Sequence, residues 1–206
     1  MSLRLNGSNS GFSEITAPAT AGDNTLTLPA GNGSANQYLA NGSTAGQLAF
    51  VTPPGSFTSY AIISDEKSAD THGGTFTSGA FRTRDLNNEI ADPDGIVSIS
   101  SNQFTLGAGS YFISASAPAF QVNAHQTRLY DITGSAVVEL GTKESSASSD
   151  GTTTQSFVKA RVVITGSTVY EIQHRCFSSK SSFGFGAAAD FSGVEVYTIV
   201  EIFKEA

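Results

Sequence analysis

The chain has 206 residues, enough for one domain with a single core and a short additional segment. Only 14 % of the residues are charged, and glycine and small polar residues abound, which is typical of short strands joined by tight turns. The formal net charge of -7 argues against a protein that binds a phosphate backbone, so no nucleic acid partner is expected.

The sequence also bears on the compartment. It contains no apolar run of about 18 residues, so no membrane insertion is expected. Its first residues, MSLRLNGSNSG, lack the apolar centre of a signal peptide, and we therefore expect assembly in the cytoplasm. The single cysteine, Cys176, excludes an internal disulfide and agrees with a reducing compartment.

Residues 1–57 are poor in apolar side chains and rich in turn formers. Three short apolar pieces run into Asn-Gly-Ser, and because Asn-Gly favours turns, we expect strands of a few residues at 3–8, 26–34 and 38–43. Such a segment buries too little surface to fold alone, so it is either disordered or ordered against other chains. We favour the second, with a β-rich arm that docks through Leu3, Leu5, Leu26, Leu28, Tyr38 and Leu39.

VTPPGSFTS at 51–59 marks the boundary, because two consecutive prolines exclude helix and regular strand pairing. Residues 58–206 then contain about ten runs in which apolar and polar residues alternate, separated by Gly, Asp, Asn and Ser clusters. In SFVKARVVI, Phe157, Lys159 and Arg161 form a solvent face, and the residues between them pack. This spacing predicts an all-β sandwich or jelly roll.

The last run, VEVYTIVEIF, is apolar on both faces. We expect Val194, Val196 and Val200 on one side and Tyr197, Ile199 and Phe203 on the other. A strand buried on both faces of a two-layer sandwich must meet another subunit, so the run predicts an oligomer with an interface on this strand. Three charged residues in other strands, Arg82, Arg84 and Arg128, are candidates for salt bridges across the same subunit seam, with sugar or receptor contact as the alternative.

Binding residues concentrate on loops of rigid sandwiches, which points to 143–154 and 178–191. We expect Lys143, Lys180, Phe183 and Phe185 to be receptor contacts, with the two aromatic rings as stacking platforms for a sugar. The alternative is that both rings fill the axis of an oligomer.

No arrangement of residues indicates catalysis, a metal or a cofactor. The histidines His72, His125 and His174 lack metal-ligand spacing, and we expect a structural role for His174 and a buried core position for Cys176. Asp92 and Asp94 in ADPDG fit a turn, with calcium as the alternative reading.

Several phrases together carry a family resemblance: GAFRTRDLN at 79–87, NQFTLGAGSYFISASAPAF at 102–120, HQTRLYDITGS at 125–135, TVYEIQHRC and VEVYTIVEIFK. Residues 60–206 resemble the C1q/TNF-like jelly-roll heads at the ends of bacteriophage fibres. GSNSG, EITAP, AG and TLTLP between residues 7 and 29 are similar to a repeat of marine phage virion proteins. This chain departs from a typical tail fibre because fewer than 60 residues precede its head.

The resemblance implies an all-β C1q/TNF-like jelly roll preceded by an extended β-rich arm that is a stalk or virion attachment. It also implies a non-enzymatic homotrimer in a phage virion, which docks to other virion proteins through the arm and binds a host surface polysaccharide or protein through the head. A capsid decoration or head-fibre role stays open. A hydrolase of surface glycans is the rival from another class, and it requires paired carboxylates, whereas the acidic residues here are scattered.

Overall fold

The computed structural model describes residues 2–6, 10–16, 20, 22–23, 25–53, 57–189 and 191–206, and gives only the backbone for residues 2–6, 12–14 and 16. The chain divides into two compact units, Met1–Pro54 and Gly55–Ala206. We call the first the N-terminal unit and the second the head. The division lies three residues before the boundary expected from the sequence.

The N-terminal unit contains two small antiparallel hairpins. β1 (Ser2–Asn6) pairs with β2 (Phe12–Thr16), and β3 (Tyr38–Asn41) pairs with β4 (Leu48–Val51). Two of the three pieces expected to be strands are therefore strands. The middle piece, at 26–34, forms only an isolated bridge between Thr27 and Gln47. Pro29, Gly31 and Gly33 lie within this piece and disfavour a regular strand there.

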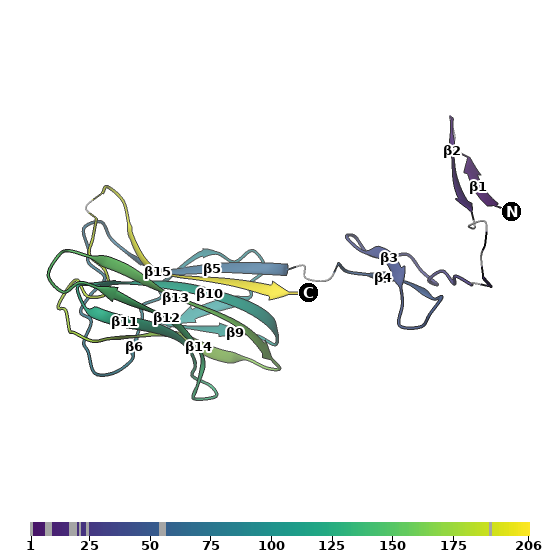
Figure 1. Cartoon of the computed structure of the whole chain (residues 1–206). Coiled ribbons are helices and arrows are strands. Elements are labelled where there is room, and N and C mark those ends of the chain that lie inside the picture. Colours follow the sequence, from purple (N-terminus) through teal and green to yellow (C-terminus); the bar gives the residue numbers. More distant parts are fainter. Residues whose placement is uncertain are drawn as a thin grey trace. The chain divides into compact units, whose positions relative to one another are not determined.

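The head is built entirely from strands in its described residues (Figure 1). They are β5 (Phe57–Lys67), β6 (Arg82–Thr83), β7 (Asn88–Ala91), β8 (Val97–Ser100), β9 (Gln103–Leu106), β10 (Gly109–Phe120), β11 (Asn123–Asp131), β12 (Ala136–Ser146), β13 (Thr153–Ile164), β14 (Thr168–Cys176) and β15 (Glu195–Glu205).

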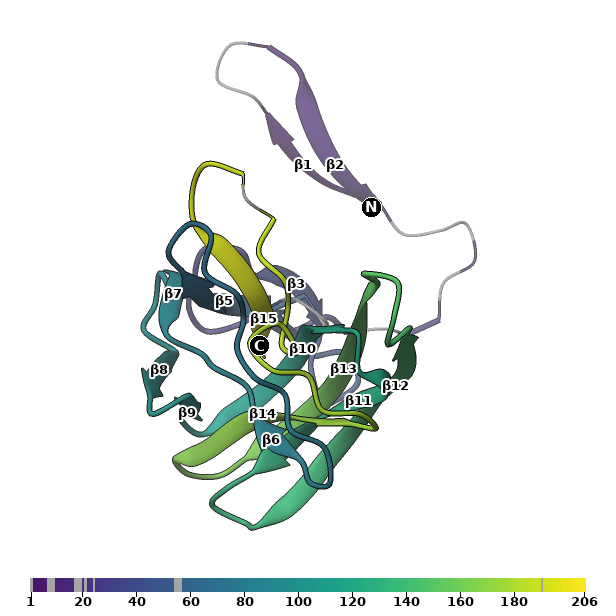
Figure 2. The ribbon, with the colours of Figure 1, turned by 90° about the vertical axis from the view of Figure 1, so that its left-hand side faces the viewer.

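These strands form two antiparallel sheets that pack face to face, as the end-on view of Figure 2 shows. The five-stranded sheet has the order β13-β10-β15-β5-β7, and the six-stranded sheet has the order β12-β11-β14-β9-β8 with β6 beside β14. The main strands pair in a nested way, because β5 pairs with β15, β9 with β14, β10 with β13 and β11 with β12. This first-with-last nesting is the connectivity of a jelly roll, so the predicted all-β jelly-roll head is confirmed.

Strict alternation explains why these segments are strands. In β13, Val158, Ala160 and Val162 are buried, whereas Phe157, Lys159 and Arg161 are exposed, as predicted. Buried side chains of both sheets meet in one core that includes Ile63, Phe104, Tyr111, Ile172 and Ile202. The other face of each sheet points to solvent, so the two outer faces are the surfaces open to partners or ligands.

The C-terminal strand differs from its expected pattern because of a β-bulge. The register with β5 passes from Val196–Glu66 to Ile199–Ser64, so β15 holds one extra residue there. The bulge reverses the alternation. Before it, Val196 is exposed and Tyr197 is buried; after it, Ile199 points outward and Val200 points inward. The expected grouping of Val194 and Val196 with Val200, and of Tyr197 with Ile199, is therefore wrong.

Candidate binding site

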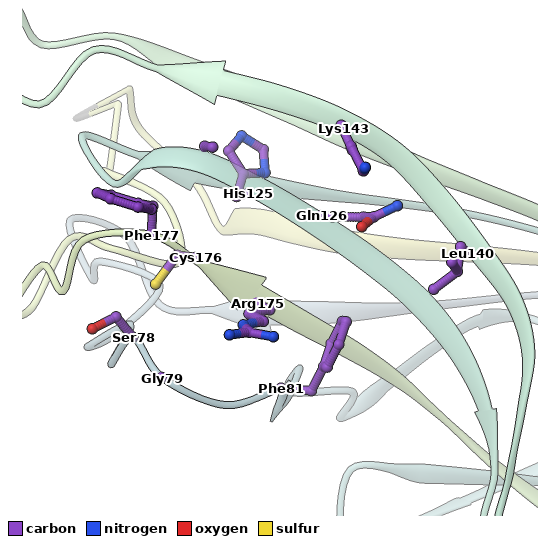
Figure 3. A pocket seen from close by; sticks show the side chains of 11 residues that line it. Ser78, Gly79, Phe81, His125, Gln126, Leu140, Lys143, Arg175, Cys176 and Phe177 are labelled. Atoms are coloured by element: carbon purple, nitrogen blue, oxygen red, sulfur yellow. The ribbon is translucent and has the colours of Figure 1, made fainter.

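A hollow with a volume of about 670 Å³ lies on the outer face of the six-stranded sheet. Its lining comes from the loop between β5 and β6 and from β11, β12 and β14 (Figure 3). The lining residues are Ser78, Gly79, Phe81, Ala124, His125, Gln126, Leu140, Lys143, Arg175, Cys176 and Phe177.

Strand register places two cations in one row across this hollow. Gln126 on β11 pairs with Lys143 on β12 on one side and with Arg175 on β14 on the other. Register partners share a sheet face, and neighbouring strands lie about 4.8 Å apart, so the two charged residues flank Gln126 at a backbone separation of about 10 Å. Both cationic side chains are exposed. The ion pairs of the described part of the chain involve Lys67 and Arg161, and neither hollow cation takes part in one.

Two aromatic rings accompany the cations. Phe177 follows β14 directly, and its side chain is 77 % exposed, so a large apolar ring faces water. Phe81 comes from the loop before β6, and the Arg128 guanidinium lies 3.8 Å from its ring centroid. This contact is a cation–π interaction that holds the Phe81 ring on the sheet.

Below these groups, His125 and Cys176 are buried register partners on β11 and β14. His125 uses Nδ1 for His174 and Nε2 for Thr154, so neither nitrogen is left to take the thiol proton. Burial raises the pKa of the Cys176 thiol to about 11, which keeps it protonated at neutral pH. The pair is therefore not an activated nucleophile, and the predicted buried core position of Cys176 is confirmed.

The residues expected to contact a receptor lie in two places. Lys143 lines the hollow, whereas Lys180, Phe183 and Phe185 belong to the long loop before β15 and lie outside its lining. The Lys180 ammonium donates to Gln121 Oε1 at 2.6 Å, and Phe183 packs on the His72 ring with centroids 4.0 Å apart.

Phe185 is part of the interior. It packs against the buried Phe76 ring at 4.4 Å and carries the Arg84 guanidinium at 4.2 Å from its centroid. These two contacts tie the partly buried Phe185 ring to the interior of the head. The sequence reasoning missed Phe81, Leu140, Arg175 and Phe177, although HRCF at the end of a strand run places a cation and an aromatic ring together.

The three arginines expected at a subunit seam are separated from the face of Ile199 and Phe203. Arg82 and Arg128 belong to strands of the six-stranded sheet. Arg84 is 0 % exposed and has no surface through which to reach another subunit. Its guanidinium donates to Thr198 Oγ1 at 2.8 Å and to the carbonyl oxygens of Pro118 and Phe185 at 3.3 and 2.9 Å.

The turn reading of ADPDG is supported by its contacts. The Asp92 carboxylate accepts the backbone N–H groups of Ile96 and Val97 at 2.8 and 2.9 Å, and Gly95 has a φ of 64°. Asp94 accepts the hydroxyl of Ser59 at 2.6 Å. Across the residues that the structure describes, no three His, Cys, Asp or Glu side chains gather as metal ligands would. A search of the same residues finds no helix suited to crossing a bilayer.

No family model matches this sequence, and a search of curated proteins gives no match. Similar solved structures include the globular domain of a zebrafish complement 1qA protein, with 12 % identity, 71 % of this chain and 96 % of that chain covered, and a TM-score of 0.44. Eiger TNF from S. frugiperda has 11 % identity, covers 71 % and 92 % of the two chains, and has a TM-score of 0.49. The PRD1 phage vertex protein P5 has 17 % identity, covers 74 % and 100 %, and has a TM-score of 0.42.

Proposed function

We propose that this protein is a homotrimeric, non-enzymatic component of a phage virion whose head binds a host surface molecule and whose N-terminal unit docks to other virion proteins. The observation that carries the proposal is a set of apolar side chains on the outer face of the five-stranded sheet, where they lie among the charged residues Lys159, Arg161 and Glu201. The phage setting and the number of three subunits rest on the sequence resemblance.

That outer face presents aromatic and aliphatic side chains in register. Tyr60 on β5, Phe203 on β15 and Phe112 on β10 form one row across three neighbouring strands. Four residues further along β10, Ser116 is aligned with Ile199 on one side and with Phe157 on the other. Tyr60 and Phe157 are 44 % and 47 % exposed in the single chain. Covering such a face is worth about 25 cal/mol per Å² of apolar surface, which favours association of heads through this sheet.

The proposed interface differs from the one expected from the sequence in its members. It keeps Ile199 and Phe203, which point outward from β15, and adds Tyr60 and Phe157. It leaves out Tyr197, whose side chain is 6 % exposed and whose hydroxyl donates to Thr71 O at 2.7 Å. Val194 and Val196 are exposed and precede the bulge in the sequence, and we place them at the margin of the proposed interface.

Exposed apolar side chains also support a docking role for the N-terminal unit. Leu26 and Leu28 are 66 % and 69 % exposed, and Tyr38 and Leu39 are 46 % and 44 % exposed. In its described residues, the unit forms two small hairpins with which to cover them. The side chains of Leu3 and Leu5 lie outside the described residues. Contact with other virion proteins would bury this apolar surface.

A non-enzymatic head agrees with the chemistry of the hollow. Its described lining includes no aspartate or glutamate, whereas hydrolysis of a glycosidic bond needs a carboxylic acid beside a carboxylate. Binding by three identical heads in one rigid assembly multiplies a weak single-site affinity through effective concentration. Attachment by avidity is therefore the proposed mechanism.

Native mass in solution tests the trimer. Light scattering after gel filtration is expected to give three times the 21.3 kDa of one chain. Ile199→Asp and Phe203→Asp place charges on the outer face of the five-stranded sheet and are expected to give monomers. Val137→Asp is the control, because Val137 is an apolar residue that is 44 % exposed and belongs to β12 of the other sheet. A monomeric wild-type chain would overturn the proposal.

Immunogold labelling of purified particles with an antibody against the head tests the virion role. Label on the tail supports host attachment, and label spread over the capsid supports the decoration role. Particles without label contradict both.

A further inference from the structure

We propose that the hollow on the six-stranded sheet binds an acidic saccharide, with Lys143 and Arg175 holding its carboxylate or other anionic group and Phe177 packing against a sugar ring. This inference rests on the proposed host-binding function and specifies its ligand class. It moves the binding surface away from the 178–191 loop.

Charge is the first reason for an anionic ligand. The whole chain has a formal net charge of -7, yet the described lining of this hollow contains two cations and no carboxylate. Guanidinium and ammonium groups bind carboxylates and phosphates by charge-assisted hydrogen bonds, and the guanidinium does so through two parallel N–H groups. Glu144, the glutamate next to Lys143 in the sequence, is directed elsewhere, because it is the register partner of the inward-pointing His125.

The aromatic ring at the rim is the second reason, and it points to a sugar. Phe177 is 77 % exposed in a position where its backbone is fixed, because its N–H donates to the Ala124 carbonyl at 2.8 Å. A rigid apolar ring beside cations matches a saccharide ring, which has an apolar face and polar substituents at its edge. A simple ion needs no such ring, and an uncharged sugar needs no paired cations.

The hollow is also built before any ligand arrives. Gln126 Nε2 donates to the Gly141 carbonyl at 2.8 Å, which fixes the amide between the two cations. Ser78 N–H donates to Ser179 Oγ at 2.9 Å and ties the loop before β6 to the chain after β14. Arg128 Nε donates to Gln173 Oε1 at 2.6 Å while its guanidinium covers Phe81. Preorganised walls lower the entropy that binding must offset.

Titration of the full-length chain with two tetrasaccharides tests the proposal. Oligogalacturonate supplies a carboxylate on every ring, and cellotetraose is a neutral probe of equal length. We expect the acidic probe to bind at least about tenfold more tightly, with affinity that falls as the ionic strength rises from about 0.05 to about 0.5 M.

Variants assign the binding to the hollow. Lys143→Gln combined with Arg175→Gln, and Phe177→Ala alone, are each expected to weaken oligogalacturonate binding by about tenfold or more. Phe191→Ala is the matched control for the ring, since it removes a 79 % exposed phenyl group outside the lining of the hollow, and it is expected to change the affinity by less than about twofold.

Equal binding of the two probes, or no binding of either up to about 5 mM, overturns this inference. So does acidic binding that survives the Lys143/Arg175 and Phe177 variants. Native mass separates these results from the proposed function: a chain that is trimeric but binds no acidic probe loses only the ligand assignment, whereas a monomer that binds the probe through Phe177 loses the trimer and keeps the hollow.

Discussion

Nδ1 of His125 lies 2.9 Å from Nε2 of His174, and the two rings meet edge to face with centroids 5.0 Å apart. Both side chains are buried, at 3 % and 0 % exposed. His174 Nδ1 has no hydrogen-bond partner among the described residues, so the expected structural role of His174 holds with one nitrogen unsatisfied. Burial of both rings favours the neutral form of each imidazole.

This pair predicts loss of stability on acidification. Burial lowers the pKa of His125 to about 4, and burial together with the Arg84 and His125 charges lowers the pKa of His174 well below 6.5. Between pH 6.5 and pH 4 the unfolded chain therefore takes up protons that the folded chain does not. The stabilisation is complete above pH 6.5 and declines as the pH falls to about 4, by an amount on the order of 3 kcal/mol for His125.

Urea denaturation midpoints between pH 4 and pH 7.5 measure this effect. His125→Gln is expected to flatten the dependence of the unfolding free energy on pH, because one titrating group is removed. His72→Gln is the control: His72 is only partly buried and contacts Ala188 and Phe183 instead of the pair. Equal pH slopes in the wild type and His125→Gln contradict the assignment.

Two arginines that are two residues apart in the sequence, Arg82 and Arg84, predict mutational effects of different size in the head. Arg84→Met removes three buried hydrogen bonds and leaves two backbone carbonyls without their donor, so a loss of about 3 kcal/mol is expected. Arg82 is exposed and donates only to Thr77 O at 3.3 Å, so Arg82→Met is expected to cost less than about 0.5 kcal/mol. Thermal and urea unfolding of the two variants measure the losses of unfolding free energy. Similar losses for Arg82→Met and Arg84→Met would show that the buried contacts of Arg84 do not stabilise the head.

Much of the head follows from alternation, and its exceptions have physical causes. The long runs that form β10, β13 and β14 were predictable because apolar residues of a buried face alternate in them with polar residues of a more exposed face. β7, with the sequence NEIA, was missed since its two apolar residues, Ile90 and Ala91, are consecutive and show no alternation. The bulge before Ile199 could not be predicted from the pattern of apolar residues, and it reversed the faces of Val196 and Tyr197 relative to the expected ones.

The binding hollow was predictable only in part. Lys143, Arg175 and Phe81 are far apart in the sequence, and the pairing of β11 with both β12 and β14 brings them to one surface. Phe183 and Phe185 looked like loop aromatics, but the loop folds back so that Phe185 N–H donates to the Gly74 carbonyl at 3.1 Å. Contacts between distant loops of this kind are not encoded in local periodicity.

A close backbone approach at Gly141 gives a third prediction. A Cβ at this position would lie 2.6 Å from the Phe157 carbonyl oxygen and would also collide with Thr127 Oγ1. Gly141→Ala must therefore push apart β11, β12 and β13, and we expect it to destabilise the head by about 2 kcal/mol or more. Gly166→Ala meets no atom within 4 Å and is expected to be nearly neutral. Equal unfolding midpoints of the two variants would contradict this contact.

Deletion of residues 1–54 tests the independence of the head. Among the described residues, the main core cluster and a smaller one around Phe76 consist of residues between Ala61 and Ile202. We expect the truncated chain to unfold in one cooperative transition, with a free energy within about 1 kcal/mol of the full chain. Because Tyr60, Phe157 and Phe203 remain, its native mass is expected to stay at three chains and to fall to one chain when Phe203→Asp is added. A truncated head that is folded but monomeric would move the assembly contacts into the N-terminal unit, since the outer face of the five-stranded sheet would then be open and unused.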